Sequence, residues 1–319
     1  METSYRTISM QEGSLIEINS SPIFGVAGFP PAFFKSDFGK KRENVFAWLS
    51  SLGLNWIELQ NTYGVKMRDD QATLYNKLAT EHNIGISIHA PYYITLASGD
   101  SDVVKRSKER FLQCFALAYK LNSQRIIFHP GHYSGNGKDD RKRAVIKIAN
   151  ALKEIKHELP KGVIVYPETA GKRSQIGSIE EILDICELVD YARPCIDVAH
   201  IHGFEGGTLT TQENIIKVLD KVIVRFGIEY LKQAHFHMYP IEVDRNGEKK
   251  HKAFHDRIGH QQLTIFETIY YDKYYPIAED FISAIKIKNI QPVVICEARD
   301  SQESGALLMK SFFYNEGQK

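Results

Sequence analysis

The stretch that decides the fold is ISIHAPYY (86–93), in which an apolar run passes into the metal-ligand type His89 and then into a loop. The same order of apolar run, His or carboxylate and loop recurs in five further segments. They are RIIFHPGH (125–132), GVIVYPETAG (162–171), PCIDVAHIHG (194–203), QAHFHMY (233–239) and PVVICEARD (292–300). A parallel barrel points the carboxyl ends of all its strands at one place. We therefore expect residues that are far apart in the sequence to meet in one cluster.

The whole sequence predicts eight short apolar strands that alternate with amphipathic helices. The apolar runs are continuous, which is typical of parallel strands covered on both faces. Eight β–α units in one chain favour an α/β fold of the (β/α)8 or TIM-barrel type. The expected strands are 23–27, 54–59, 84–89, 125–129, 162–168, 194–198, 233–238 and 292–297.

The helices carry their own start signals. The pattern over 103–121 predicts a helix with Ser101 or Asp102 as its N-cap. Ser178-Ile-Glu-Glu181 has the form of a capping box. We expect a single TIM-barrel domain over 1–319 with a polar lead-in over about 1–20. The stretch 240–262, dense in charge and histidine, is predicted to be a long irregular active-site loop.

The composition is typical of a globular protein. Hydrophobic residues make up 43% of the chain and charged residues 25%, enough to fill and cover a sizeable core. The formal net charge of +1 argues neither for nor against nucleic acid as a partner. Because the sequence shows neither a signal-peptide pattern nor an apolar run of ~20 residues, we expect a cytoplasmic protein without a membrane span. The separated cysteines are expected to be buried thiols: Cys114, Cys186, Cys195 and Cys296.

The residue types that end the strands predict a metal cluster. Taken singly, each His is more simply explained as a structural or surface residue, and Glu168 and Asp197 as helix caps. Taken together, six consecutive strands, the third to the eighth, end in a ligand type. Imidazole mixed with carboxylate, without thiolate, suits zinc, manganese or iron better than calcium or magnesium. Since the candidates exceed what one tetrahedral ion needs, we expect two or three ions, as in metal-assisted phosphoryl displacement.

One run of residues resembles a known family. His89-Ala-Pro-Tyr-Tyr-Ile-Thr-Leu-Ala-Ser98 is similar to the HAPY-x-INLAS motif of endonuclease IV, the metal-dependent AP endonucleases. In the family's order, further likeness lies in Phe128-His-Pro-Gly131, Glu168-Thr-Ala-Gly171 with Gly177, and Cys195-Ile-Asp-Val-Ala-His200. Glu58-Leu-Gln60, Gly64-Val-Lys-Met67 and 237–251 look most like the archaeal-type branch within the xylose-isomerase-like TIM barrel superfamily. The resemblance covers roughly residues 23–310.

The resemblance implies a barrel that holds three metal ions, usually zinc, with manganese or iron as alternatives. It implies cleavage of the phosphodiester 5′ to an abasic site by attack of metal-bound hydroxide, on double-stranded DNA and by a monomer. Glu168, which matches a carboxylate that bridges two metals, and Glu297, which matches one that handles the attacking water, are the expected catalytic residues. The implied metal ligands are His89, His129, Glu168, Asp197, His200, His237, His251 and Glu297.

Two parts of this ligand set stay open. His235 and His237 point to the same face of the strand, and the similarity of the following residues 238–242 to the family favours His237. The family's last loop carries an Asp-x-His pair, whereas Glu248-Lys-Lys-His251 is one residue wider. We expect Glu248 and His251 to form the pair, with His255 and His260 as competing ligands.

DNA contacts are expected at three residues, and a rival function exists. Tyr92 can stack on a flipped sugar or base. Lys172 and Arg173 can neutralise phosphates, although a solvated loop surface explains them equally well. The rival is a divalent-metal-dependent sugar isomerase or epimerase, with one ion on Glu168, Asp197, a seventh-strand His and Glu297. Glu58 keeps that alternative open, because isomerase-type sites use an acid at the end of the second strand.

Overall fold

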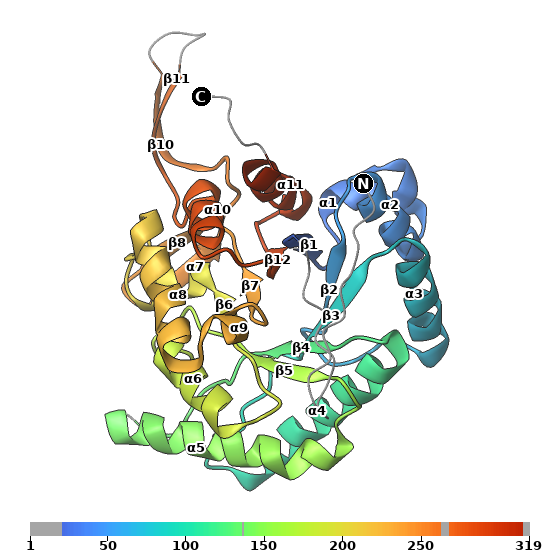
Figure 1. Cartoon of the computed structure of the whole chain (residues 1–319), viewed down its shortest axis with the longest axis vertical. Coiled ribbons are helices and arrows are strands. Elements are labelled where there is room, and N and C mark those ends of the chain that lie inside the picture. Colours follow the sequence, from blue (N-terminus) through green and yellow to red (C-terminus); the bar gives the residue numbers. More distant parts are fainter. Residues whose placement is uncertain (1–20, 136, 263–267, 315–319) are drawn as a thin grey trace.

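The structure is a computed structural model that describes residues 21–135, 137–262 and 268–314, with the backbone alone over 260–262 and 268–271. The expected lead-in over 1–20 lies outside these residues. Eight parallel strands form a nearly closed barrel that helices surround (Figure 1), which confirms the predicted (β/α)8 fold. No helix in the described part of the chain combines the length and the apolar character that a membrane crossing requires.

The barrel strands are hydrogen-bonded in the order β5-β4-β3-β2-β1-β12-β7-β6. They are β1 (Ile23–Ala27), β2 (Trp56–Gln60), β3 (Gly85–His89), β4 (Arg125–Phe128), β5 (Ile164–Pro167), β6 (Cys195–Asp197), β7 (His235–His237) and β12 (Val293–Cys296). All eight predicted strands are present, with ends that differ by at most two residues. The two end strands of the sheet, β5 and β6, meet through isolated bridges, Val165 with Ala192 and Glu168 with Cys195.

Helices follow most of the strands and pack on the outside of the barrel (Figure 1). The α-helices are α1 (Pro31–Lys35), α2 (Val45–Ser51), α3 (Asp69–Glu81), α4 (Ser101–Leu121), α5 (Lys138–Ile155), α6 (Ile179–Leu188), α7 (Val198–Phe204), α8 (Gln212–Phe226), α9 (Ile228–Leu231), α10 (Ala278–Ile287) and α11 (Gln302–Tyr314). Short 3-10 turns are η1 (Asp37–Lys40), η2 (Arg42–Asn44) and η3 (Lys156–Glu158).

The capping signals were right at one helix and displaced at another. Ser178 and Glu181 form the predicted capping box at the start of α6, each side chain accepting a backbone N–H of the other. At α4 the N-cap is Asp100, whose carboxylate accepts the N–H of Asp102 at 2.8 Å. The expected Ser101 and Asp102 are therefore the first helical residues. An acidic residue there still suits the positive end of the helix dipole.

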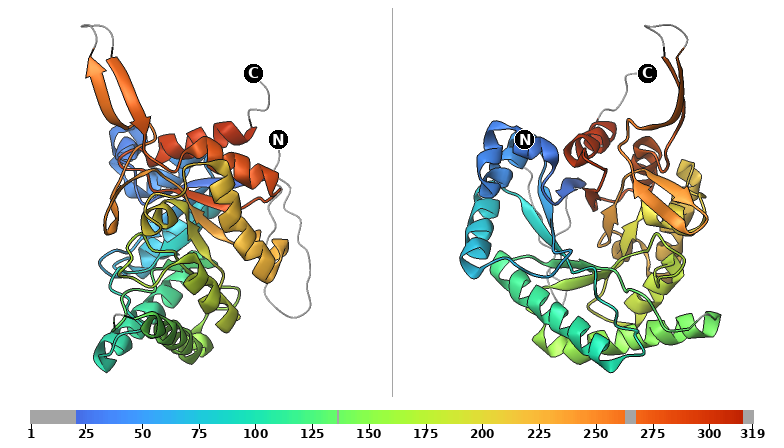
Figure 2. Two further views of the ribbon diagram at one scale, coloured as in Figure 1. Left: turned by 90° about the vertical axis from the view of Figure 1, so that its left-hand side faces the viewer. Right: turned by 180° about the vertical axis from the view of Figure 1, so that it is seen from behind.

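Two β-hairpins replace the irregular loop that the sequence predicted over 240–262. β8 (Ile241–Asp244) pairs antiparallel with β9 (Gly247–His251), and β10 (Arg257–Gln262) pairs antiparallel with β11 (Thr268–Lys273). In Figures 1 and 2 the β10–β11 hairpin projects away from the barrel, while β8 and β9 lie against it beside α7. The alternation of Ile241-Glu-Val-Asp244 in β8 was a strand signal that the prediction did not use, while the charged GEKKH of β9 carries none.

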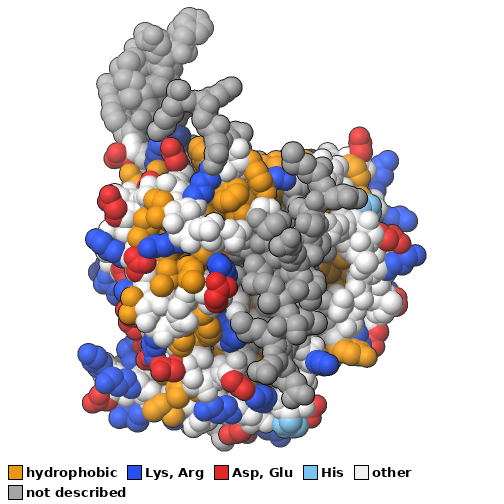
Figure 3. Space-filling view, in the orientation of Figure 1, with side chains coloured by type: hydrophobic (Ala, Val, Ile, Leu, Met, Phe, Trp, Pro, Cys, Tyr) orange, Lys and Arg blue, Asp and Glu red, His pale blue; other side chains and the backbone are white. Residues whose placement is uncertain are grey.

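The surface and the core differ sharply in composition. On the face in Figure 3, basic and acidic side chains are interspersed. All four cysteines are free and buried, which confirms the prediction of buried thiols. Inside the barrel, however, polar residues replace part of the usual apolar filling. Glu58, Ser87, His235 and His237 are fully buried there. His237 belongs to the candidate site, and the other three lie behind it.

Candidate metal centre

Glu168 lies at the centre of a buried cluster at the carboxyl ends of the barrel strands. Its Oε2 faces Nε2 of His89 at 3.1 Å and Nε2 of His129 at 3.4 Å. Its Oε1 faces Nδ1 of His237 at 3.1 Å and Nδ1 of His200 at 3.2 Å. Each carboxylate oxygen thus meets two imidazoles, so that one oxygen can serve one cation and the other a second.

The ligand types arrive from six strands. His89 ends β3, His129 follows β4, Glu168 follows β5, Asp197 ends β6, His237 ends β7 and Glu297 follows β12. Asp197 is also the N-cap of α7, since its Oδ1 accepts the N–H of His200 at 2.7 Å. Its Oδ2 lies 3.3 Å from Nδ1 of His200. Asp197 therefore acts both as a helix cap and as a carboxylate of the cluster.

The histidines are placed as metal ligands are. Nδ1 of His89 lies 3.0 Å from the backbone oxygen of Ala90, which can only accept, so this nitrogen carries a proton. A neutral ring then directs its Nε2 lone pair at Glu168. His251 repeats the pattern, with Nδ1 3.0 Å from the Glu297 backbone oxygen and Nε2 facing a carboxylate. Two lone pairs this close repel unless a metal ion or a second proton lies between them. The donor set therefore fits metal ions.

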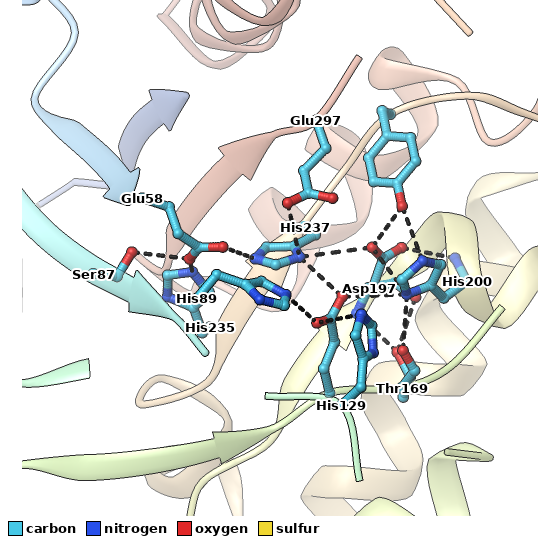
Figure 4. A network of polar contacts seen from close by, with 12 residues as sticks. Glu58, Ser87, His89, His129, Thr169, Asp197, His200, His235, His237 and Glu297 are labelled. Carbon is cyan, nitrogen blue, oxygen red and sulfur yellow. Dashed lines mark hydrogen bonds and ion pairs between the residues drawn. The ribbon is translucent and has the colours of Figure 1, made fainter. Parts of the chain in front are cut away.

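Behind His237 stands a second carboxylate, Glu58. Figure 4 shows Glu58 on one side of His237 and Asp197 on the other. Nε2 of His237 lies 3.1 Å from Oε1 of Glu58, in an ion-pair contact without hydrogen-bond alignment. Oε2 of Glu58 accepts from Ser87 at 2.9 Å and lies 2.9 Å from Nε2 of His235. A carboxylate behind a ligating histidine fixes the ring and raises its basicity. The structure places His237, and not His235, against Glu168.

A third group of ligand types comes from β9. Glu248 places Oε2 2.9 Å from Nε2 of His200 and Oε1 3.0 Å from Nε2 of His251. The hairpin reaches this position because it docks on glycines, and a Cβ at Gly171 would fall 2.3 Å from Oε2 of Glu248. The N–H of Glu248 also donates to the Gly171 backbone oxygen at 2.9 Å. Of the competing ligands, His255 is exposed beside Asp256, and the side chain of His260 lies outside the described residues.

Two members of the site were missed from the sequence. The Tyr239 hydroxyl donates to Oδ2 of Asp197 at 2.9 Å, and its ring stacks on His251 with centroids 4.2 Å apart. Gln60 donates from Nε2 to Oε1 of Glu297 at 3.2 Å. Tyr239 stands two residues after His237, and Gln60 two after Glu58. The period-two rule for strand faces was the signal that could have found both.

The cluster shifts the pKa values of its members in opposite directions. Burial lowers the pKa of His89, but the hydrogen bond and charge of Glu168 outweigh it and raise that pKa to about 9. Burial raises the pKa of Glu168, yet the surrounding imidazoles hold it well below its usual range. Burial lowers the pKa of His129 to about 4. His129 is therefore neutral near pH 7, which is the form that binds a metal.

The expected DNA contacts lie at or near the mouth of this site. Tyr92 is 50% exposed, and its ring centroid lies 6.0 Å from that of His129. Tyr92 and Lys172 both line a cavity of about 210 Å³ that opens onto the cluster. Arg173 lies farther out, where its Nε donates to the Phe204 backbone oxygen at 2.8 Å. Their role in binding DNA stays a prediction.

The chain belongs to the xylose isomerase-like TIM barrel family, whose model matches residues 46–312. An uncharacterized protein of Methanocaldococcus jannaschii is 30% identical over 296 residues, which cover 92% of this chain and 97% of that protein. A probable endonuclease 4 of Aquifex aeolicus is 26% identical over 230 residues, 70% of this chain and 78% of its own. These relatives confirm the likeness to endonuclease IV that the motifs predicted.

Solved structures share the barrel at lower sequence identity. Endonuclease IV from Thermus thermophilus is 13% identical with a TM-score of 0.62, over 91% of this chain and 98% of its own. A D-psicose 3-epimerase crystallised with D-fructose is 14% identical with a TM-score of 0.58, over 90% and 99%. At this identity the likeness shows the fold alone, so the choice between a nuclease and an epimerase depends on the site.

Proposed function

We propose that this protein is a metal-dependent phosphodiesterase that nicks DNA 5′ to abasic sites, an endonuclease IV-like hydrolase of base-excision repair. The observation that carries the proposal is that Glu168 is flanked by imidazoles on both oxygens, with a third ligand group beside it. Bound divalent ions, with zinc as the first choice and manganese or iron as alternatives, supply charge that stabilises the attacking and leaving oxygens of a phosphoryl displacement.

The donor atoms divide into three groups, two of which share Glu168. Nδ1 of His237 lies 3.7 Å from Oδ2 of Asp197 and 3.8 Å from Oε1 of Glu297. We assign one ion to each group. The groups are His89 with His129 and Glu168; Glu168 with Asp197, His237 and Glu297; and His200 with Glu248 and His251.

Two carboxylates have catalytic roles in the proposal. Glu168 would hold two of the ions, one on each carboxylate oxygen's side, because each oxygen faces imidazoles. Glu297 lines the cavity, and burial raises the pKa of its carboxyl above its usual value. A carboxylate with a raised pKa is a better proton acceptor, so Glu297 can take a proton from a water molecule held in that cavity. Gln60 keeps its Oε1 in place.

The proposed partner is double-stranded DNA that contains abasic sites, bound by a monomer in the cytoplasm. Relatives named endonuclease 4 support DNA as the substrate class. Within the cavity mouth, Tyr92 offers a ring for stacking and Lys172 a cation. Arg173 extends the positive charge along the same loop, so that Lys172 and Arg173 are placed to neutralise neighbouring phosphates.

A sugar isomerase or epimerase is the second candidate, favoured by the barrel shared with D-psicose 3-epimerase. Such an enzyme needs one ion, for which Glu168, Asp197, His237 and Glu297 would suffice. His129 has no role in that scheme, because it faces the other oxygen of Glu168. The number of ions bound therefore separates the two functions.

The test combines elemental analysis with a nicking assay on duplex DNA that carries one abasic site. The full-length protein is expected to hold more than one ion and to nick the strand, while Glu168→Ala and His129→Ala abolish nicking. His157→Ala is the matched control, because this histidine is exposed on η3, and it should nick as the natural chain does. One ion per chain, no nicking and interconversion of ketoses would establish the epimerase instead.

The same DNA tests the two cations. A Lys172→Ala, Arg173→Ala double variant is expected to bind with a shallower dependence on salt, since fewer counterions are released when fewer phosphates are neutralised. An unchanged slope would remove both residues from the interface while leaving the nuclease proposal intact.

A further inference from the structure

A second cavity, larger than the one over the metal centre, adjoins it. Its volume is about 530 Å³, within the ~300–1,000 Å³ range of small-molecule sites. The loops that follow β1 and β2 and the first turn of α3 surround it. Gln60 and Thr62 line both cavities. Gln60 also donates a hydrogen bond to the carboxylate of Glu297. A ligand can therefore extend from the metal centre into this second cavity.

One wall of the second cavity is aromatic and preoriented. Phe34 is 47% exposed, and its ring packs edge-on against Phe33 with centroids 5.2 Å apart. Phe33 is fully buried and packs on Trp48 at 5.5 Å. Phe29 lies 6.2 Å from Phe34 in the same wall. An exposed ring held by buried rings loses little freedom when a flat ligand stacks on it.

The charge of the second cavity is positive. Arg42 and Lys66 line it, and its described lining contains no Asp or Glu. Neither cation forms an ion pair within the described part of the chain. The guanidinium of Arg42 lies over the Phe29 ring, 5.4 Å from its centroid. Free cations beside aromatic faces are the combination that binds single nucleotides, through the phosphate and the base respectively.

We propose that the second cavity binds a nucleotide that retains its base, namely the intact neighbour of the abasic residue on the same strand. This inference rests on the proposed nuclease function, and it divides the substrate between two compartments. The smaller cavity over the metal centre takes the abasic sugar and its phosphate. The larger cavity stacks the neighbouring base on Phe34 and places its phosphate near Arg42.

The first experiment measures binding without cleavage, by calorimetric titration of the metal-loaded full-length protein with dAMP and with 2-deoxyribose 5-phosphate. We expect dAMP to occupy the second cavity and the sugar phosphate to occupy the smaller cavity over the metal centre. Phe34→Ala should lose about tenfold in dAMP affinity and nothing for the sugar phosphate. Arg42→Ala, which removes no ring, should weaken dAMP and leave the sugar phosphate, which belongs to the smaller cavity, unchanged.

Tyr119→Ala serves as the matched control, because it removes an exposed ring from α4 that does not line the cavity. Its dAMP affinity is expected to equal that of the natural chain. A Phe34→Ala variant that binds dAMP as Tyr119→Ala does would overturn the subsite.

The second experiment uses abasic duplexes whose neighbours on the lesion strand either keep their bases or lack them. We expect loss of the neighbouring base to raise KM about tenfold for the natural chain and to leave KM unchanged for Phe34→Ala. Equal responses of the two proteins would contradict the subsite while the nuclease stands. Binding of dAMP through Phe34 without nicking of any duplex would contradict the nuclease while the subsite stands.

Discussion

At the scale of single residues, the site contains an imidazole that lies between two carboxylates. His237 has Glu168 on one nitrogen and Glu58 on the other, and both carboxylates are buried. Burial raises the pKa of Glu58, but the charge of His237 and the contacts of His235 outweigh it, and the pKa lies below its usual range. Glu58 is thus a permanent negative charge that orients His237 from outside the cluster.

The prediction for Glu58 concerns metal affinity. Glu58→Gln keeps the shape of the side chain and removes its charge, so we expect metal affinity to fall about 10- to 100-fold, as it does for partners behind ligating histidines. Competition with a chelator of known affinity measures this directly. Ser87→Ala is the control, because it removes one hydrogen bond to Glu58 but leaves the charge. Metal affinity equal to that of the natural chain in Glu58→Gln would deny Glu58 this role.

At the scale of elements, the β8–β9 hairpin completes the site by docking on the loop after β5. Lys172 and Gly247 form an isolated antiparallel bridge. Gly247 has a φ of +114°, a backbone conformation that L side chains rarely adopt. A Cβ there would lie 2.2 Å from the Gly171 backbone oxygen. A close backbone approach of Gly247 to Gly171 therefore helps to bring Glu248 and His251 into the cluster.

Gly247→Ala is expected to detach this hairpin and to cost the protein one ion per chain, because it displaces Glu248 and His251 together. The ions on the groups around Glu168 should remain. Elemental analysis measures the metal content per chain. Arg245→Ala, an exposed change in the same turn, serves as the control. An unchanged metal content in Gly247→Ala would show that the third group binds no ion.

The contrast between strands and hairpins explains what the sequence could predict. The barrel strands were found because both of their faces are buried, which requires continuous apolar runs such as those of β4 and β12. The ligand types at their ends followed from the convergence of parallel strands. The strand GEKKH of β9 has no apolar run of this kind. Its position depends on the glycines against which the β8–β9 hairpin docks. Tyr239 and Gln60 differ from β9, because the period-two rule for strand faces could have placed them beside His237 and Glu58.

At the scale of the whole molecule, the barrel carries a buried group of ionisable side chains at the carboxyl end of its strands. Metal ions and protons compete for the same nitrogens, so the stability of the protein depends on both. In the metal-free protein, His89 takes up a proton on folding, because its pKa rises from 6.5 to about 9.

The stability of the metal-free protein is therefore expected to fall as pH rises from 6.5 to 9. The contribution of the His89 imidazolium is complete below pH 6.5 and is lost as pH passes about 9, at up to about 1.4 kcal/mol per pH unit for one group. With zinc added, the trend should reverse, because deprotonated ligands bind metal better. Urea unfolding with and without chelator measures both. A chelated protein that is more stable at pH 9 than at 6.5 would contradict this account.

The contact between β5 and β6 links the cluster to the closure of the barrel. These strands are the two edges of one sheet, and isolated bridges are the ladder pairing between them in the described chain. Glu168 stands on one edge and Asp197 on the other, with Nδ1 of His200 3.2 Å and 3.3 Å from their oxygens. An ion coordinated from both edges would cross-link the two edge strands and help to close the barrel. Removal of the ions would then leave the closure to the isolated bridges and to the hydrogen bonds of Thr169 with Cys195 and Asp197, so that the barrel wall would open more easily at this point.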